Sequence, residues 1–500
     1  MSDAMKLSEL VAETDASRPE TDPEVFDVVL DSRRVRPGAV YVGLPGTRHH
    51  GAHFAKEAAA AGAVALITDP QGAKIVSGIS IPVCIADDPR EVMGVAAARI
   101  HGHPSRSMGT FAVTGTNGKS TTVFMIDAAL RAAGRHVGVI GTLGFLVDGQ
   151  PIDVETTTIT TPESPDLQQN LVRMREAGVQ DVAMEVSSHA LVLGRVSGMH
   201  FDIAGFTNLG RDHLDFHHTV EQYFEAKAKL FTSQLCRCAV ITIDDDPGRR
   251  MAGRALDAGL GVSTVGFAED ADYRIVSHRP EATGSVMQLA HPRGLLEVNV
   301  GLPGVHNLSD AALALAMIDQ GDVDITVAAS GLADVVIPGR MQPVPLGDDA
   351  PRVYVDFAHT PQAISSALEA LNYAQRAGRV IVVLGAGGDR DPDKREPMGA
   401  AAARLADVVV VTDDNPRSEE PAAIRARVLA GARSVEGRAV QVVDGGDRRS
   451  AIETALRIAE RADVVAILGK GHEKTQQLAD CTINFDDVAE IVSAWERGQA

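Results

Sequence analysis

Cysteine is scarce in this sequence, with only Cys84, Cys236, Cys238 and Cys481 among 500 residues. Four scattered cysteines are too few for a disulfide framework, and the close pair in the middle of the chain lacks the second pair that a zinc site needs. Such cysteine usage is typical of a reducing compartment. We therefore expect neither a disulfide scaffold nor a structural zinc ion.

Long apolar runs are also missing. The N-terminal stretch MSDAMKLSELVAETDASRPE contains no apolar core of signal-peptide length, and no later run approaches the roughly 18 uncharged apolar residues of a transmembrane helix. We expect a soluble cytoplasmic protein that does not insert into a membrane.

Positive charge is in deficit, because 67 acidic residues stand against 47 basic ones and give a formal net charge of -20. This excess would repel a phosphate backbone, so the composition argues against nucleic acid as a ligand. Small anionic ligands would then need local basic pockets. At about 100 to 200 residues per domain, the length of the chain indicates roughly three domains.

What the sequence does contain is the stretch TGTNGKSTT at residues 114–122. An apolar run at 110–113 predicts a buried strand before it, and helical spacing over 120–133 predicts a helix after it. Strand, glycine loop and helix in this order form a phosphate cradle, because main-chain N–H groups and the helix N-terminus both favour an anion. We expect a nucleoside triphosphate to bind there.

Single residues of the phosphate cradle have separate tasks. Gly115 and Gly118 let the main chain approach the anion closely. Lys119 can reach the outer phosphates, and Ser120 can offer its hydroxyl to magnesium. The general pattern would place a further glycine at Val113, and a glycine turn with a chance lysine is the alternative interpretation.

Residues 24–104 have an α/β pattern of their own, with a predicted helix at 52–61 and a strand at 63–68. Ser32 and Arg33 lie at the end of a predicted strand, where open sheets often bind ligands. Turn residues with a solvated arginine would give the same pattern. A linker is expected at 101–107.

The central segment, about 108–337, alternates apolar strands with helices. The predicted strands include 137–140, 182–186, 203–206 and 240–243. This alternation predicts a mostly parallel sheet with ligands at the carboxyl ends of its strands. Residues 273–300 instead alternate apolar and polar side chains, which predicts a small antiparallel hairpin with a turn near 282–284.

Polar residues follow these strands at their predicted ends. Glu185 ends one strand, and Lys227 lies on a predicted helix. A polar run after the strand that ends at Thr207 contains Asn208, Arg211, Asp212, His213 and Asp215. Together with Ser120 and His213, Glu185 would supply ligands suited to magnesium at one edge of the sheet. Taken alone, Glu185 would equally fit a helix cap.

From about residue 341, a second strand and helix alternation predicts another doubly wound sheet. Its predicted strands are 353–357, 380–384, 408–411, 440–443 and 464–468. The loops after them read DFAHTP at 356–361, GAGGDRDPDKR at 385–395, DDNPR at 413–417 and GKGHE at 469–473. Polar loops with glycine or proline at so many strand ends are better explained as one site than as solvated decoration.

In this order the motifs resemble the Mur ligases, and among them the UDP-N-acetylmuramoyl-tripeptide synthetases. The resemblance covers nearly the whole chain, through DSRRVRPGAVYVGLPG, GTNGKSTT, AMEVSSHAL, TNLGRDHLDFH, YFEAKAKLF, VIPGRMQ, DFAHTP, GGDRDPDKR, DDNPRSEEP and GKGHE. It implies an α/β protein of three domains: a small UDP-substrate domain at 1–107, a central ATP domain with a P-loop sheet at 108–338, and a Rossmann-like amino-acid domain at 339–500.

The resemblance also implies a reaction. ATP would activate the D-glutamate carboxylate of UDP-MurNAc-L-Ala-D-Glu as an acyl phosphate, and the amino group of a diamino acid would attack it, releasing ADP and phosphate. Because carboxylate and ATP are both anions, Lys119 and magnesium would neutralise the developing charge. The partners implied are these small molecules, and we expect a monomer.

By resemblance, two magnesium ions are held, one by Ser120 and Glu185 and the other by His213 and Lys227 as N6-carboxylysine. A carbamate derived from CO2 would turn the Lys227 ammonium into an oxygen ligand, which requires the neutral amine. An ordinary surface lysine is the alternative interpretation. Lys229 is a competing candidate, but the E-A-K register of the family selects Lys227.

Further contacts are implied residue by residue. Those to ATP are Gly115, Thr116, Asn117, Gly118, Lys119, Ser120, Thr121, Asn307, Arg340, Asp356 and His359. Those to the UDP-sugar dipeptide are Ser32, Thr160, Thr161, Ser187 and Arg195. The chain departs from the family pattern at Asp310, where asparagine is usual, and at Phe357, where tyrosine is commoner.

The sequence DNPR resembles the motif that selects meso-diaminopimelate. This amino acid carries a second carboxylate at its far end, and an arginine fork grips a carboxylate in a planar, bidentate way. The residues implied are Arg390, Asp414, Asn415, Pro416, Arg417, Gly469 and Glu473, with Glu473 facing the distal ammonium. Lysine would leave Arg390 and Arg417 without an anion.

Other functions compete with this interpretation. A lysine-adding ligase is disfavoured by DNPR, and a folylpolyglutamate synthetase lacks the N-terminal DSR domain. A P-loop switch or motor would use the same phosphate cradle. A nucleotide-binding regulator would have lost the metal ligands, yet Glu185, His213 and Lys227 are present. Dependence of ATPase activity on both other substrates would distinguish a ligase from these.

Overall fold

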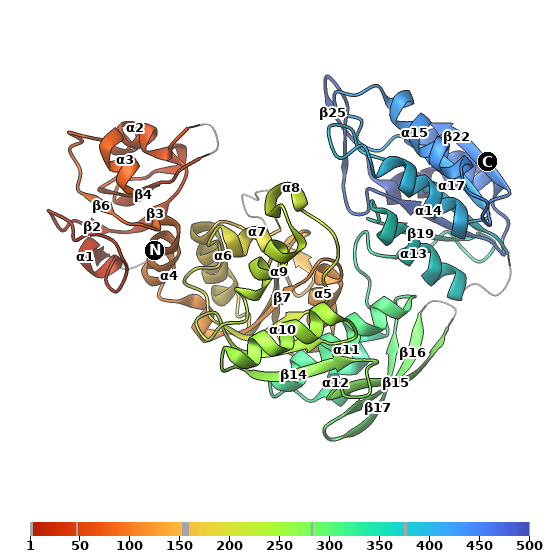
Figure 1. The fold of residues 1–500 in the computed structure, drawn as a ribbon, viewed down its shortest axis with the longest axis horizontal. Helices are drawn as coiled ribbons and strands as arrows, with labels where there is room; N and C mark the ends of the chain where they lie inside the picture. The colour runs from red at the N-terminus through yellow and green to blue at the C-terminus, as the bar shows by residue number, and fades with distance from the viewer. Residues whose placement is uncertain (1–3, 47–48, 153–159, 282–283, 375–377, 500) are drawn as a thin grey trace. The chain divides into compact units, whose positions relative to one another are not determined.

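The computed structural model describes residues 4–46, 49–152, 160–281, 284–374 and 378–499. The chain divides into two compact units, one of Met1–Arg274 with Ala312–Gly331 and one of Ile275–Ala311 with Leu332–Ala500 (Figure 1). All four cysteines are free thiols. None of the helices in the described ranges has the length and apolar character needed to cross a membrane.

The first unit begins with a four-stranded parallel sheet in the order β3-β4-β5-β6. Successive side chains of a strand point to opposite faces, so Val40 and Val42 pack against α1 and α4, while Tyr41 packs against α2. The strands are β1 (Met5–Lys6), β2 (Glu24–Val25), β3 (Asp27–Val29), β4 (Ala39–Gly43), β5 (Ala65–Thr68) and β6 (Val83–Ile85). The helices are α1 (Leu7–Leu10), η1 (Ser32–Arg34), η2 (Gly51–Phe54), α2 (Ala55–Ala60), α3 (Pro70–Ile75) and α4 (Pro89–Ile100).

A larger sheet follows in the same unit, in the order β10-β9-β8-β11-β7-β12-β13-β14. Strands β8, β11, β7, β12, β13 and β14 are parallel, which confirms the predicted mostly parallel sheet, and β9 and β10 add an antiparallel edge. The strands are β7 (Gly109–Thr114), β8 (Val137–Gly141), β9 (Gly144–Val147), β10 (Gln150–Pro151), β11 (Asp181–Glu185), β12 (Phe201–Phe206), β13 (Cys236–Thr242) and β14 (Gly261–Gly266).

The helices that accompany this sheet are η3 (Pro104–Ser107), α5 (Lys119–Ala132), α6 (Ser164–Glu176), α7 (Ser188–Val192), α8 (Leu214–His217), α9 (Val220–Ala228), α10 (Asp246–Asp257) and α12 (Ile325–Ala328). Helix α11 (Val305–Gln320) and the short η4 (Ala329–Leu332) contribute residues to both units. Because β7, β8, β11 and β12 run in one direction, their carboxyl ends share one edge, and that edge carries the candidate site.

The second unit contains a six-stranded sheet in the order β18-β19-β23-β20-β21-β22, parallel except for β18. The strands are β18 (Gln342–Val344), β19 (Arg352–Asp356), β20 (Val380–Leu384), β21 (Val408–Thr412), β22 (Gln441–Gly446) and β23 (Val464–Leu468). The helices are α13 (Pro361–Ala374), α14 (Arg395–Leu405), α15 (Pro421–Arg433), α16 (Arg448–Ile458) and α17 (Asp487–Gln499). Buried valine-rich strands such as β20 and β21 fit a sheet covered on both faces.

Two antiparallel pairs complete the strands. One is β24 (Thr475–Gln477) with β25 (Thr482–Asn484), and the other is β16 (Ser285–His291) with β17 (Gly294–Val300). Strand β15 (Tyr273–Pro280) precedes the latter pair, and its first residues pair with β14. The predicted turn near 282–284 includes 282 and 283, which lie outside the described residues.

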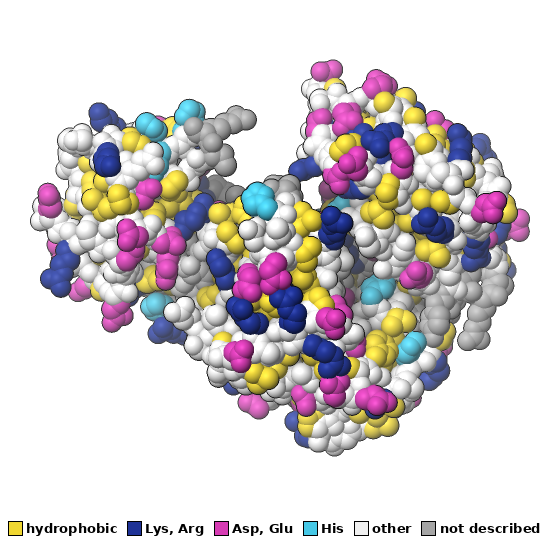
Figure 2. All heavy atoms as spheres, viewed as in Figure 1, with side chains coloured by type: hydrophobic (Ala, Val, Ile, Leu, Met, Phe, Trp, Pro, Cys, Tyr) yellow, Lys and Arg dark blue, Asp and Glu magenta, His cyan; other side chains and the backbone are white. Residues whose placement is uncertain are grey.

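Local details differ from expectation in two places. The helix predicted at 52–61 is a 3₁₀ turn followed by the short α2, because the His50 ring caps the turn by accepting from the Ala52 N–H at 3.0 Å. The linker predicted at 101–107 contains the 3₁₀ turn η3. On the visible surface, acidic and basic side chains are interspersed (Figure 2).

Candidate active site

The phosphate cradle lies between the end of β7 and the start of α5, as the order of its residues predicts. Gly115 and Gly118 adopt φ values of 154° and 85°, and a Cβ at Gly115 would lie 1.8 Å from Thr207 Oγ1, so no side chain fits there. The Thr207 hydroxyl donates to the carbonyl oxygen of Asn117 at 2.6 Å. The loop is thus fixed by the neighbouring strand end before any ligand binds.

Two lysines meet on the main chain of this loop. The Lys119 ammonium donates to the carbonyl oxygens of Gly115 and Thr116, at 3.0 and 2.9 Å. From α9, Lys227 Nζ donates to the same Gly115 oxygen at 2.7 Å. The structure therefore brings both lysines to the cradle.

Lys227 is 1% exposed, and its ammonium lies 4.3 Å from the centre of the Tyr223 ring. Burial, together with the positive charge of Lys119, holds the pKa of Lys227 well below its usual value. The interpretation as an ordinary surface lysine is therefore wrong. Lys229, the competing candidate, is exposed.

Glu185 ends β11 and is 1% exposed. Its carboxylate accepts from Ser120 Oγ at 2.9 Å, from the Thr142 N–H at 2.9 Å and from Thr142 Oγ1 at 3.1 Å. A Cβ at Gly141 would lie 2.3 Å from Glu185 Oε1. The carboxylate is not a helix cap, because Ser187 caps the following helix α7.

His213 lies just before α8, with φ of 52° and a half-exposed ring. Its ring contacts His189, with 4.9 Å between centroids, and its Nε2 is 3.5 Å from Asp212 Oδ2. The Tyr223 ring lies between it and Lys227, at 6.2 Å from the His213 ring. Within the described ranges, no group of three or more His, Cys, Asp or Glu side chains is arranged to hold a metal ion.

The residues expected to contact the UDP-sugar dipeptide gather around Glu185, with one exception. Thr161 Oγ1 donates to the Glu185 carbonyl oxygen at 3.0 Å and accepts from the Ser187 N–H at 3.1 Å. Thr160 Oγ1 is 3.1 Å from Thr142 Oγ1. The exception is Ser32, which starts η1 on the smaller sheet.

Arg195 reaches this group through an acid that the sequence analysis did not single out. Glu163 accepts from Arg195 Nε at 2.9 Å and from Arg90 Nη1 at 3.1 Å. Arg195 Nη1 also donates to the Thr161 carbonyl oxygen at 3.2 Å. Glu163 follows the two threonines directly in the sequence TTPE, but nothing in that spelling reveals its arginine partners.

The second unit holds the remaining residues expected near ATP. Asp356 ends β19 and accepts from the N–H groups of Met341 and Ala358, at 2.7 and 2.8 Å. The Arg340 guanidinium lies over the Phe357 ring at 4.8 Å, and His359 Nδ1 is 2.7 Å from the Phe357 carbonyl oxygen. Asn307 is buried and donates to the Pro303 carbonyl oxygen at 2.7 Å.

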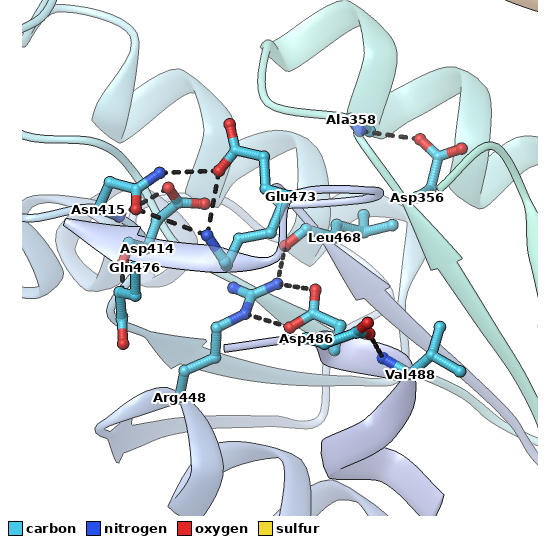
Figure 3. A network of polar contacts seen from close by, with 12 residues as sticks. Asp356, Ala358, Asp414, Asn415, Arg448, Leu468, Glu473, Gln476, Asp486 and Val488 are labelled. Carbon is cyan, nitrogen blue, oxygen red and sulfur yellow. Dashed lines mark hydrogen bonds and ion pairs between the residues drawn. The ribbon is translucent and has the colours of Figure 1, made fainter. Parts of the chain in front are cut away.

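Asp414, Asn415, Lys470, Glu473 and Gln476 form what we call the Asn415 cluster (Figure 3). Glu473 accepts from Asn415 Nδ2 at 2.9 Å and from Lys470 Nζ at 3.0 Å, and Gln476 Nε2 donates to the Asp414 carbonyl oxygen at 2.5 Å. Lys470, the lysine of GKGHE, is fully buried and was not among the expected site residues. Gly469 comes so close that its Cβ would lie 2.6 Å from Asp414 Oδ2.

Arg417 lies beside this cluster and is half-buried. Its Nη1 donates to the Gly388 carbonyl oxygen at 2.6 Å and its Nε to Gln477 Oε1 at 3.0 Å. Among the described residues it forms no ion pair. Arg390 is exposed and is not drawn into the cluster.

Next to the cluster, Arg448 and Asp487 form a fully buried ion pair, of which Arg448 is labelled in Figure 3. Arg448 Nε and Nη2 each donate to the Asp487 carboxylate at 2.7 Å, and Nη2 also donates to the Leu468 carbonyl oxygen at 3.1 Å. The pair thereby holds the end of β23, from which Gly469 and Lys470 follow. Sequence reasoning missed it, because its partners belong to different helices.

Comparison with known proteins agrees with this arrangement. Family models described as "Mur ligase family, catalytic domain", "Mur ligase middle domain" and "Mur ligase, glutamate ligase domain" match residues 25–104, 113–318 and 339–471.

Two similar proteins and a solved structure carry the same name. The UDP-N-acetylmuramoyl-L-alanyl-D-glutamate–2,6-diaminopimelate ligase of Corynebacterium efficiens is 45% identical over 96% of this chain and 92% of its own length. That of Streptomyces avermitilis is 44% identical over 97% and 95%. A solved structure of a ligase with this name superposes with a TM-score of 0.73 at 31% identity, covering 100% of both chains. The chain belongs to the Mur ligase family.

Proposed function

We propose that this chain is an ATP-dependent ligase that joins meso-diaminopimelate to UDP-MurNAc-L-Ala-D-Glu through an acyl phosphate, as a step in making peptidoglycan precursors. The substrate names come from its relatives, which are named for this reaction. The motif DNPR and the surroundings of Arg417 support the same amino acid.

The observation that carries the proposal is that the cationic Arg417 adjoins, through Gln477, the Asn415 cluster that contains the acidic Glu473. Arg417 donates its side-chain hydrogen bonds to a main-chain carbonyl and an amide, and among the described residues it forms no ion pair. Glu473 is half-buried in the Asn415 cluster, where Lys470 and Asn415 both bind its Oε2, and its Oε1 has no hydrogen-bond partner among the described residues. A zwitterionic side-chain end with one carboxylate and one ammonium would complement such a pair of charges, whereas lysine would satisfy only the acid.

The phosphate cradle supports ATP as the second substrate. Its glycines are fixed by contacts with the neighbouring strand end, and Lys119 is tethered to the loop itself. Main-chain N–H groups at a helix N-terminus and a nearby ammonium favour a polyphosphate. We assign Lys119 the task of stabilising charge on the transferred phosphoryl group.

Magnesium fits the residues at the sheet edge, since Ser120 and Glu185 already place a hydroxyl and a buried carboxylate 2.9 Å apart. These two would hold one ion, and His213 with a modified Lys227 the second. Bound there, magnesium would act as a Lewis acid on phosphoryl and carboxylate oxygens. The chain's own task is to hold the Glu185 carboxylate in place through its bonds from Thr142.

Lys227 is suited to carbamylation, because burial lowers the pKa of its amine and so favours the neutral form. In the reaction, the Nζ lone pair forms a bond to the carbon of CO2, one C=O π bond breaks and leaves its electron pair on oxygen, and Nζ loses a proton to water. With ¹³C-bicarbonate, ¹³C NMR of the protein should show one carbamate signal. The signal should vanish in Lys227→Ala and persist in Lys229→Ala, and its persistence in Lys227→Ala would reject the assignment.

Phosphate release tests the overall function. With ATP and the UDP-linked dipeptide present, release should depend on meso-diaminopimelate and be much weaker with lysine. A P-loop switch or motor would release phosphate without either substrate, and a regulator would release none. Equal rates with lysine would instead favour a lysine-adding ligase.

We also infer that the enzyme works as a monomer in the cytoplasm, where ATP and nucleotide-activated sugars are available. Its acidic composition supports small-molecule partners over nucleic acid. Light scattering on the full chain at micromolar concentration would test the monomer directly.

A further inference from the structure

We propose that Arg395 and Glu419 are positioning residues for the amino-acid substrate: their ion pair locks the loop 385–394 to the loop 413–420 and so holds Arg417 in its binding conformation. The inference rests on the proposed function and names residues outside the DNPR motif. We call this ion pair and the bonds around it the loop clamp.

Arg395 is the first residue of α14 and is only 4% exposed. Its Nη1 and Nη2 donate to the two carboxylate oxygens of Glu419, at 2.9 and 2.7 Å. Nη2 also donates to the Gly387 carbonyl oxygen at 3.2 Å. One guanidinium therefore holds an acid from one loop and the main chain of the other in a planar, bidentate arrangement.

Glu419 binds the first loop a second time. Its Oε1 accepts from the Asp389 N–H at 2.7 Å. The Asp389 carboxylate in turn accepts from Ser418, from Oγ at 2.6 Å and from the N–H at 3.1 Å. The two loops are thus interlocked by reciprocal side-chain to main-chain bonds, with Arg395 as the buried anchor.

The loop clamp sets the distance between the loops 385–394 and 413–420. The Gly388 N–H donates to the Asn415 carbonyl oxygen at 2.9 Å. A Cβ at Gly388 would lie 1.9 Å from the Pro416 carbonyl oxygen, so this approach leaves no room for any side chain.

Arg417 depends on that distance. It adopts φ of 52°, a left-handed conformation that a residue with a side chain rarely takes unless its surroundings impose it. Its Nη1 is bonded to the Gly388 carbonyl oxygen at 2.6 Å, so a shift of the first loop would shift the guanidinium directly. The loop clamp can therefore govern amino-acid affinity without touching the amino acid.

The neighbouring residue on α14 offers a matched control. Glu396 pairs with Arg427 at 3.0 Å, joins α14 to α15, and is half-exposed. It makes no bond to either loop among the described residues. A change at Glu396 removes an ion pair of the same chemistry but leaves the loop clamp intact.

The experiment compares Glu419→Gln, Arg395→Lys and Glu396→Gln in the full-length enzyme. In the first two, the KM for meso-diaminopimelate should rise about 10-fold to 50-fold, because small misplacements of a binding group are costly. The KM for ATP should stay within about 2-fold, and the preference over lysine should fall. Glu396→Gln should match the wild type.

Non-additivity gives a second readout. Because both residues act through one contact, the KM of the double variant Arg395→Lys/Glu419→Gln for meso-diaminopimelate should be little higher than that of the single variant with the higher KM. Unchanged diaminopimelate KM in both single variants would overturn the inference, and so would equal rises for ATP and diaminopimelate with a lowered melting temperature. If the wild-type enzyme itself fails to use diaminopimelate, it is the proposed function that falls.

Discussion

The phosphate cradle and the Asn415 cluster are built in opposite ways. In the cradle, main-chain groups hold the charged side chains: Lys119 and Lys227 both donate to the Gly115 carbonyl oxygen. In the cluster, side chains hold one another, with Lys470 and Asn415 both bound to Glu473. The loop of the first site is encoded within a short stretch of sequence, although Lys227 joins it from 112 positions away, whereas the second site depends on side chains from two distant loops.

This difference predicts how each site fails. A cradle made of main chain should keep its shape when one side chain is removed, so that only chemistry is lost. A cluster made of mutually bonded charges should lose stability as well, because removal of one partner leaves another buried and unsatisfied.

The largest effect is expected next to the cluster. Asp487→Asn would leave the fully buried Arg448 without its counter-charge, which should lower the free energy of unfolding by about 3–5 kcal/mol. Urea denaturation of the full chain measures this. Glu490→Gln is the matched control, since its partner Arg449 neighbours Arg448 on α16 but is 56% exposed, and the cost there should be about 0.5 kcal/mol.

In the cradle, Lys119→Ala should lower kcat by about 100-fold to 1000-fold, because it removes a charge that stabilises the phosphoryl group in the transition state. The melting temperature should hardly change. Steady-state phosphate release checks the rate, with the exposed Lys229→Ala as control. A large loss of stability in Lys119→Ala would erase the contrast between the two sites.

Arg417→Ala tests how the residue beside the cluster selects the amino acid. Loss of a charge-assisted hydrogen bond should lower kcat/KM for meso-diaminopimelate by about 10-fold to 100-fold. For lysine, which lacks the distal carboxylate, kcat/KM should change by less than about 3-fold. Equal losses with both amino acids would show that Arg417 supports the site without selecting its substrate.

The smallest effect is a pH dependence in the loop that carries the cluster. Burial, with Arg340 nearby, lowers the pKa of His472 from 6.5 to about 4. Between pH 6.5 and 4, His472 is protonated in the unfolded chain but still neutral in the folded one. The free energy of unfolding should therefore fall as the pH drops over this range, by about 1–3 kcal/mol in total. In His472→Gln the free energy of unfolding should fall less over this pH range than in the wild type. Urea denaturation midpoints measured across the range test this.

Much of the architecture could be predicted from the sequence because it follows from local patterns. Apolar runs such as the valines of β20 and β21 mark strands covered on both faces, and glycine followed by lysine and serine marks the turn into α5. Since parallel strands end at one edge, the pattern also predicted that Ser120 and Glu185 would lie together. They are 2.9 Å apart.

What escaped prediction is contact between residues far apart in sequence. Arg448 and Asp487 are 39 positions apart on different helices, and Arg90 meets Glu163 across 73 positions. Neither pair has a local signature, because the sequence around an arginine at a helix start does not distinguish a buried side chain from an exposed one. The burial of Lys227 was likewise open, since its helix has charged neighbours at both ends.

Gly141, at the end of β8, leaves room for the Glu185 carboxylate because it has no side chain. A methyl group there would collide with the side chain of Glu185, whose Cγ, Cδ and Oε1 atoms all lie within 2.9 Å of that position. An apolar side chain at this position would therefore displace the carboxylate that we assign to magnesium, and we expect it to lower ligation activity without itself touching a substrate.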